Sequence, residues 1–124
     1  MNSQDKLILN QADFQRLVSL VRATNSEVVE LLEEELGRAS VVPDGELPKD
    51  VVAMNSKVTF KDVESGKESV VTVVYPHEAD IDEGKVSVLT PVGSALIGLR
   101  VGQDIKWPFP HGKQKKLLVL AVAS

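Results

Sequence analysis

Residues 90–104 carry the strongest structural signal in this chain and read Thr90-Pro91-Val92-Gly93-Ser94-Ala95-Leu96-Ile97-Gly98-Leu99-Arg100-Val101-Gly102-Gln103-Asp104. They follow the strand-like run Val86-Ser87-Val88-Leu89. Proline fixes its own backbone angle and ends the strand before it, whereas each glycine permits a turn or a close backbone approach that a side chain would block. The pattern predicts a sharp strand-turn-helix-turn-strand unit, with a short helix over residues 91–99.

The rest of the carboxy-terminal half reads as short β-strands. Runs rich in β-branched and aromatic residues predict strands at residues 57–60, 68–75, 85–89, 105–107 and 116–121. Turn residues separate the first two strands at 62–67 and the last two at 108–112. Because a sheet must bury its apolar face against another element, we expect an antiparallel sheet covered by the short helix.

The amino-terminal half has helical periodicity instead. After the N-cap candidate Asn10, apolar residues recur at helical spacing and predict a helix over residues 11–23. A second helix is expected to carry an apolar stripe, while its glutamates face water; the stripe is Val28, Val29, Leu32, Leu36 and Ala39, and the glutamates are Glu30, Glu33, Glu34 and Glu35. Helices joined by so short a turn form an antiparallel hairpin.

A linker divides the chain into two predicted domains. Residues 41–49 contain Pro43, Gly45 and Pro48, which prevent a helix from continuing. We therefore expect an α+β protein, with a short helical hairpin and linker over residues 1–46 and a sheet domain over residues 47–124. A chain of 124 residues is long enough for one good core plus such an appendage.

Composition limits the possible functions. With no cysteine, the chain has neither disulfides nor a thiolate nucleophile or metal ligand. A net charge of -4 at pH 7 disfavours direct nucleic-acid binding, which gains affinity by neutralising phosphates, and so favours a protein partner. No apolar run approaches the ~20 residues that span a bilayer, and we expect a cytoplasmic, monomeric protein.

Three segments partly match known catalytic or ligand-binding motifs, but each lacks residues that its motif requires. Residues 93–98 begin like a phosphate-binding P-loop, but Leu99 and Arg100 stand where that loop needs Lys and Ser or Thr. Residues 80–84 gather carboxylates, yet Lys85 and Pro91 occupy the Gly and Glu positions of a calcium-binding EF-hand loop. The two histidines lie in turn-like contexts without a hydrolase triad. We expect no catalytic residue, no cofactor and no metal.

The P-x-G-x-A-L-x-G spacing of residues 91–98, followed by Gly102 and Asp104, resembles the signature of the carboxy-terminal domain of bacterial Gre transcript cleavage factors. Residues 50–58 and the run Val73-Val74-Tyr75-Pro76 resemble the short branch of that superfamily called regulator of nucleoside diphosphate kinase. The resemblance covers most of residues 47–122. It implies that the sheet domain shares the architecture of FK506-binding proteins (FKBP-like).

The resemblance also implies a partner and a mode of action. In the cleavage factors, a long coiled coil enters the secondary channel of RNA polymerase, and its acidic tip helps hold a metal ion at the active centre. Here the predicted tip, residues 22–27, has one arginine and one carboxylate, and helices of ~13 residues are only about 20 Å long. We expect a non-catalytic transcription regulator that binds polymerase near the secondary channel, competes with Gre-type factors and does not stimulate transcript cleavage.

The loop entering the signature helps Gre factors dock at the rim of that channel. The matching positions, expected to bind the partner, are Leu89, Thr90, Pro91, Val92 and Ser94. Gre proteins often carry an acid where this chain has Leu89, so that ionic contact is missing.

Two alternatives stay open. An FKBP-like peptidyl-prolyl isomerase needs an aromatic-lined pocket, and this chain has only three Phe, one Tyr and one Trp. The other alternative, direct regulation of nucleoside diphosphate kinase, competes with an indirect effect on kinase levels through transcription.

Overall fold

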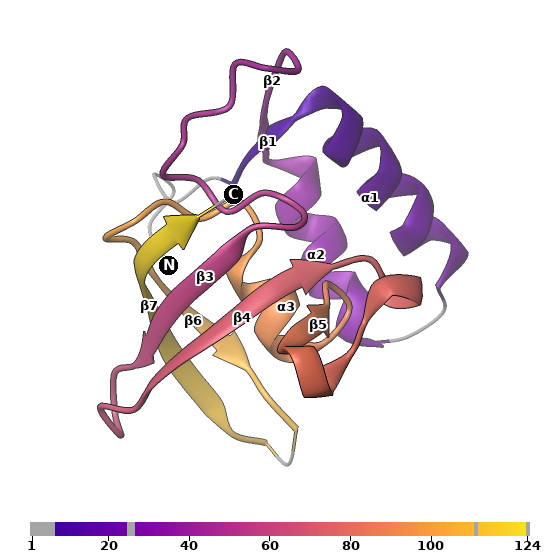
Figure 1. Cartoon of the computed structure of the whole chain (residues 1–124). Helices are drawn as coiled ribbons and strands as arrows, with labels where there is room; N and C mark the ends of the chain where they lie inside the picture. Colours follow the sequence, from indigo (N-terminus) through magenta and orange to yellow (C-terminus); the bar gives the residue numbers. More distant parts are fainter. Residues whose placement is uncertain (1–6, 25–26, 111, 124) are drawn as a thin grey trace.

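The computed structural model describes residues 7–24, 27–110 and 112–123. Figure 1 shows its elements in chain order. They are β1 (Ile8–Asn10), α1 (Gln11–Ala23), α2 (Glu27–Gly37), β2 (Ser40–Val42), β3 (Lys57–Asp62), β4 (Glu68–Val74), β5 (Lys85–Ser87), α3 (Pro91–Leu96), β6 (Asp104–Pro108) and β7 (Gln114–Ala123), with the 3₁₀ turns η1 (Pro76–Glu78) and η2 (Ile81–Glu83) between β4 and β5. The predicted α+β class is confirmed.

Five strands form one sheet in the order β5-β4-β3-β7-β6. The pairs β3–β4, β3–β7 and β6–β7 are antiparallel, but β5 runs parallel to β4. The prediction of an entirely antiparallel sheet is therefore wrong at this edge. The reason is the connection: η1 and η2 replace a tight hairpin and carry the chain back along β4 before β5 begins.

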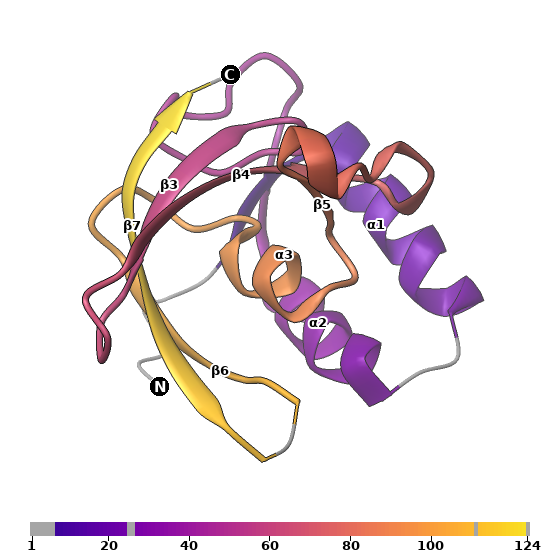
Figure 2. The same ribbon diagram turned by 60° about the horizontal axis from the view of Figure 1, so that its bottom comes forward.

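The sheet curls around α3, which Figure 2 shows between the sheet and the helical hairpin. Alternate residues of the strands point to the concave side and are buried, among them Phe60 of β3, Val73 of β4 and Leu117 of β7. The segment from Ala95 to Leu99 is buried as well, so α3 fills the concave side as predicted. The helix ends at Leu96, three residues earlier than expected.

The predicted helical hairpin is confirmed, and it packs against the sheet domain. Helix α1 spans the predicted residues, and the Asn10 side chain caps it by accepting a hydrogen bond from the Asp13 backbone N–H at 2.8 Å. The inward residues of both helices join the same core cluster as the sheet; they are Leu17, Val21, Val29, Leu32 and Leu36. The hairpin is thus a layer over α3. The side chain of Val28, placed in the stripe by sequence, lies outside the described residues.

One face of α2 differs from the prediction. Glu35 was expected to face water with its neighbouring glutamates, but it is only 3% exposed. Its carboxylate pairs with the Arg38 guanidinium at 2.8 Å. Because α2 packs against both α1 and α3, its buried face is wider than that of a helix with one neighbour, and Glu35 falls within it. Glu30, Glu33 and Glu34 are exposed as expected.

A parallel pair of short strands closes the base of the hairpin. β1 pairs with β2, so that Ile8 lies opposite Ser40. The sequence gave no sign of β2, whose last two residues fall in the predicted linker. The Ile8 backbone N–H also donates to the Gly98 carbonyl at 3.1 Å. The amino-terminal segment is therefore attached directly to the glycine signature of the sheet domain.

Candidate functional site

The loop between β5 and α3 is organised around the Thr90 side chain. The Thr90 hydroxyl donates to the Ser87 carbonyl at 2.6 Å and accepts from the Gly93 backbone N–H at 3.1 Å. It therefore caps α3 and ties the start of that helix back to the end of β5. These two hydrogen bonds restrain the loop.

Gly93 allows a very close approach between α3 and the preceding strand. A Cβ atom at this position would lie 2.3 Å from the Ser87 carbonyl oxygen and 2.8 Å from the Val88 Cα, both backbone atoms. No side chain fits there, since real Cβ contacts are longer. This contact explains why the signature requires glycine two residues after Pro91.

Ser94 was expected to contact the partner, and the structure corrects that expectation. Its side chain is only 1% exposed, and its hydroxyl donates to the Val88 carbonyl at 2.6 Å. Because the start of α3 lies directly against Ser87 and Val88, the hydroxyl is used internally. Ser94 supports the loop from within.

The other four predicted contact residues, Leu89, Thr90, Pro91 and Val92, are consecutive and partly exposed. Leu89 and Val92 also pack against the core. We call these four consecutive residues the docking loop, after their predicted role. Its side chains offer mainly apolar contacts, together with the threonine hydroxyl.

A pocket opens beside the docking loop on the concave side of the sheet. We call it the concave pocket; it has a volume of about 200 Å³ and is lined by Phe60, Asp62, Lys67, Ser69, Val92, Phe109, Lys115 and Leu117. The Lys115 ammonium lies 5.0 Å from the centre of the Phe109 ring. Sequence inspection missed this pocket because its lining comes from segments up to 57 residues apart, Phe60 and Leu117.

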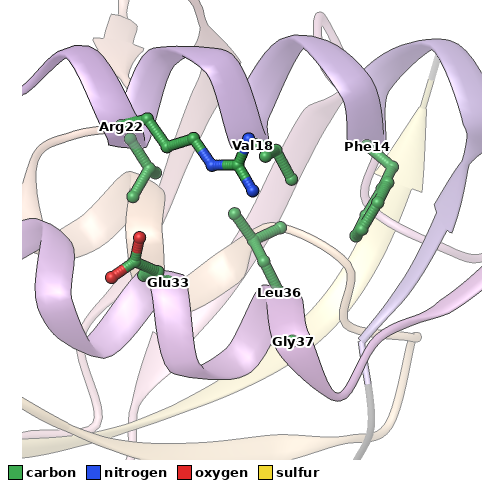
Figure 3. Close-up of a pocket in the computed structure, with 7 residues that line it drawn as sticks. Phe14, Val18, Arg22, Glu33, Leu36 and Gly37 are labelled. Atoms are coloured by element: carbon green, nitrogen blue, oxygen red, sulfur yellow. The ribbon is translucent and has the colours of Figure 1, made fainter.

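A second groove, of about 260 Å³, lies between α1 and α2 (Figure 3). Phe14, Val18 and Leu36 give it apolar walls, and Gly37 contributes no side chain. Figure 3 shows Arg22 reaching along α1 above Leu36, while Glu33 points from α2 toward α1. The predicted hairpin tip lies just beyond Arg22; residues 25–26 and the side chain of Glu27 lie outside the described residues.

The described residues contain no group of three or more histidine, aspartate or glutamate side chains placed to hold a metal ion. The neighbouring exposed glutamates Glu33 and Glu34 of α2 do not converge, since adjacent helical residues point ~100° apart. No helix in the described part of the chain is long and apolar enough to cross a membrane.

A hydrogen-bonded clasp joins the hairpin to the sheet domain. The Asp13 carboxylate accepts from the Met54 backbone N–H at 3.2 Å and from the Tyr75 hydroxyl at 3.3 Å. Burial, reinforced by the Asp13 charge, raises the pKa of Tyr75 to about 12. His77 stacks on the same tyrosine, with ring centres 6.4 Å apart. These contacts could not be predicted from the sequence, because Met54 and Tyr75 lie 41 and 62 residues from Asp13 along the chain.

Comparison with known proteins agrees with this arrangement of a hairpin and a signature-bearing sheet. The family model described as transcription elongation factor, GreA/GreB, C-term matches residues 47–124, and the model described as Rnk N-terminus matches residues 5–42. This chain belongs to the Rnk branch of the GreA/GreB family. The family resemblance of the signature is therefore confirmed.

Individual relatives support the same assignment. The regulator of nucleoside diphosphate kinase from Escherichia coli (strain K12) is 38% identical over 95% of this chain and 89% of its own length. Transcription elongation factor GreA from Clostridium acetobutylicum is 42% identical over 72% of this chain but only 57% of its own length. Shared sequence thus extends along the whole chain in the first case and along part of the longer factor in the second.

Solved structures show the same fold. The prokaryotic transcription elongation factor GreA/GreB from Nitrosomonas europaea has a TM-score of 0.78 and 39% identity, with 96% of this chain and 98% of that chain covered. Gfh1 of Thermus thermophilus aligns with a TM-score of 0.52 at 23% identity, which is evidence for the fold alone. The hairpin and curled sheet are therefore a shared architecture. The FKBP-like description and the boundary between residues 46 and 47 stay predictions.

Proposed function

We propose that this protein is a non-catalytic transcription regulator that binds RNA polymerase near its secondary channel and competes there with Gre-type factors. Family membership supports a Gre-like role. The docking loop carries the proposal further, because Thr90 and Ser94 hold it in place while Leu89, Pro91 and Val92 stay accessible. A rigid contact loop loses little conformational entropy on binding.

The short hairpin supports an action without transcript cleavage. Helix α1 has 13 residues, so at 1.5 Å per residue it is about 20 Å long. Its inner face is committed to the core, and the Asp13 clasp holds it against the sheet domain. A hairpin bound in this way does not extend as a free probe. In this proposal the protein acts by occupying its site, as a monomer in the cytoplasm.

Leu89 makes the contact apolar at a position where Gre proteins often carry an acid. Its side chain already packs partly against the core, so only its outer surface is available to the partner. We therefore expect polymerase binding to depend more on shape and apolar burial at the docking loop than on a charge there.

Binding of purified core RNA polymerase tests the proposal directly. The double substitution of Leu89→Asp with Pro91→Ala should weaken binding, because both side chains are partly exposed. Circular dichroism checks that the variant is folded, since Leu89 also packs partly against the core. The matched control is Lys57→Glu, because Lys57 is exposed at the start of β3. Asp62→Asn, at the β3–β4 turn, is a poorer control, because Asp62 lines the concave pocket. No binding by the native protein at micromolar concentration contradicts the proposal.

Competition and cleavage assays test the remaining parts. An excess of this protein should displace a labelled Gre factor from polymerase, and it should not increase RNA cleavage in backtracked complexes. Stimulated cleavage at saturating protein contradicts the non-catalytic role. If this protein binds polymerase without displacing the Gre factor, only the proposal that the two share a binding site is contradicted.

One observation favours the isomerase alternative, namely that Phe60 and Phe109 line the concave pocket. A proline-isomerisation assay with a Phe109→Ala control separates this activity from simple binding. Direct action on nucleoside diphosphate kinase is suggested only by the name of the E. coli relative, and kinase turnover with and without this protein tests it.

A further inference from the structure

The size of the concave pocket limits what it can hold. Its volume is about 200 Å³, whereas pockets for drug-sized ligands and cofactors measure ~300–1,000 Å³. A cavity of about 150 Å³ accommodates one benzene ring. The pocket therefore suits a single aromatic or aliphatic side chain better than a nucleotide or a large cofactor.

Four of the eight lining residues give the pocket an apolar wall. Phe60 and Leu117 come from the neighbouring strands β3 and β7, and both are buried. Phe109, beyond β6, and Val92, in α3, complete the apolar lining. A side chain that enters would cover apolar surface that now faces water, which is favourable in proportion to the area covered.

The polar lining of the pocket has an excess of positive charge. Among the described residues, neither Lys67 nor Lys115 takes part in an ion pair within 4.0 Å. The Phe109 ring holds the Lys115 ammonium in place by a cation–π contact. The one carboxylate in the lining, Asp62, accepts hydrogen bonds from the Glu64 and Ser65 backbone N–H groups at 3.1 and 3.4 Å. Both lysines are thus available to carboxylates from outside.

We propose that the concave pocket receives one aromatic or aliphatic side chain from a partner protein segment in which acidic residues flank that side chain, and that Lys67 and Lys115 pair with those acidic residues. Val92 belongs both to the pocket and to the docking loop, so one partner surface reaches both. In assigning the segment to RNA polymerase, the inference rests on the proposed function. Apolar insertion gives affinity, and the two lysines select the charge of the partner.

A peptide titration tests the pocket without polymerase. The probe is a blocked peptide of sequence Asp-Asp-Phe-Asp-Asp, and its neutral counterpart is Asn-Asn-Phe-Asn-Asn. In amide NMR spectra, the acidic peptide should shift Phe60, Val92 and Phe109 saturably and bind about fivefold or more tighter than the neutral one, in line with the modest value of exposed charge pairs. Equal affinity for both peptides, or shifts that miss these residues, overturns the inference. Tighter binding of a neutral proline peptide would also overturn it, in favour of an isomerase site.

Substitutions locate the charge effect. The pair Lys67→Glu with Lys115→Glu should abolish the preference for the acidic peptide, whereas Lys67→Arg with Lys115→Arg should keep it. The matched control is Lys106→Glu, an exposed position on the opposite side of β6 from buried Ile105 and Trp107. The assignment of the charge effect to Lys67 and Lys115 is contradicted if Lys106→Glu loses the preference for the acidic peptide. It is also contradicted if the paired glutamate variant keeps that preference. Circular dichroism checks that each variant is folded.

Titration of core polymerase separates this inference from the proposed function. The paired glutamate variant should weaken polymerase binding about tenfold and reduce its salt dependence, while Lys106→Glu should leave both unchanged. If the docking-loop variant weakens binding and the glutamate pair does not, the pocket inference fails and the proposed function stands. If the acidic peptide binds as expected but the native protein does not bind polymerase, the pocket stands and the polymerase assignment fails.

Discussion

Replacing Gly98 by alanine tests how the amino-terminal segment is attached to the sheet domain. Gly98 has a φ of +81°, a conformation that costs an alanine about 1–2 kcal/mol. A Cβ atom there would also lie 2.7 Å from the Leu7 Cβ, and overpacking of this kind costs about 1–3 kcal/mol. The two terms together predict a loss of about 2–5 kcal/mol in the free energy of unfolding.

Two other glycines separate these terms. Gly102 has a φ of +90° with nothing within 4 Å of an added Cβ, so Gly102→Ala should lose only the backbone part, about 1–2 kcal/mol. Gly37 ends α2, its φ lies outside the left-handed region, and an added Cβ again meets nothing within 4 Å. Gly37→Ala should therefore be neutral or stabilise by up to about 1 kcal/mol.

Urea unfolding followed by circular dichroism measures all three variants. The free energy of unfolding falls by about 1–3 kcal/mol per M of urea, so Gly98→Ala should lower the urea midpoint of unfolding by roughly 2 M. Hydrogen exchange adds a local readout, since the Ile8 amide donates to the Gly98 carbonyl and should lose protection. If Gly98→Ala costs no more than Gly102→Ala, the close contact between Leu7 and Gly98 does not constrain the fold and the reasoning is refuted.

Three further predictions concern the loop and the clasp. Thr90→Ala removes the cap of α3 and should cost about 1 kcal/mol in urea unfolding; an unchanged midpoint contradicts the capping role. Ser94→Ala leaves the Val88 carbonyl without its hydroxyl donor and should cost about 1–3 kcal/mol, while polymerase binding of the folded variant stays within a factor of about two if Ser94 is internal. The pKa of Tyr75, the only tyrosine, is raised from 10.0 to about 12. The contribution of Tyr75 to stability is therefore present below pH 10 and is lost as the pH rises to about 12. The thermal unfolding temperatures of the native protein and of Tyr75→Phe should converge at high pH, and parallel curves of unfolding temperature against pH would contradict this expectation.

Local patterns in the chain predicted the element types well. The spacing of apolar residues after Asn10 predicted α1 to the residue, and turn residues marked the β3–β4 and β6–β7 connections. Proline and glycine restrict or free the backbone wherever they occur, so the unit of β5, α3 and β6 was also predictable. What the local pattern could not show was that Gly93 and Gly98 touch Ser87 and Leu7.

The candidate site was predictable only in part. Consecutive residues such as Leu89 to Val92 stay close together in any fold, so their proximity followed from the sequence. The burial of Ser94 and Glu35 did not, because it depends on which neighbours cover each helix. The concave pocket and the Asp13 clasp were invisible for the same reason, since their members are far apart along the chain.

The amino-acid sequence by itself determined the positions of most helices, strands and turns, because periodicity and turn chemistry act over a few neighbouring residues. The glycine signature also identified the family. Only the tertiary structure decided that β5 runs parallel to β4, that β1 pairs with β2, and that two lysines meet two phenylalanines at one pocket. Those outcomes depend on long-range packing. The apolar pattern of a helix or strand shows which of its faces is buried, but it does not show which other element covers that face.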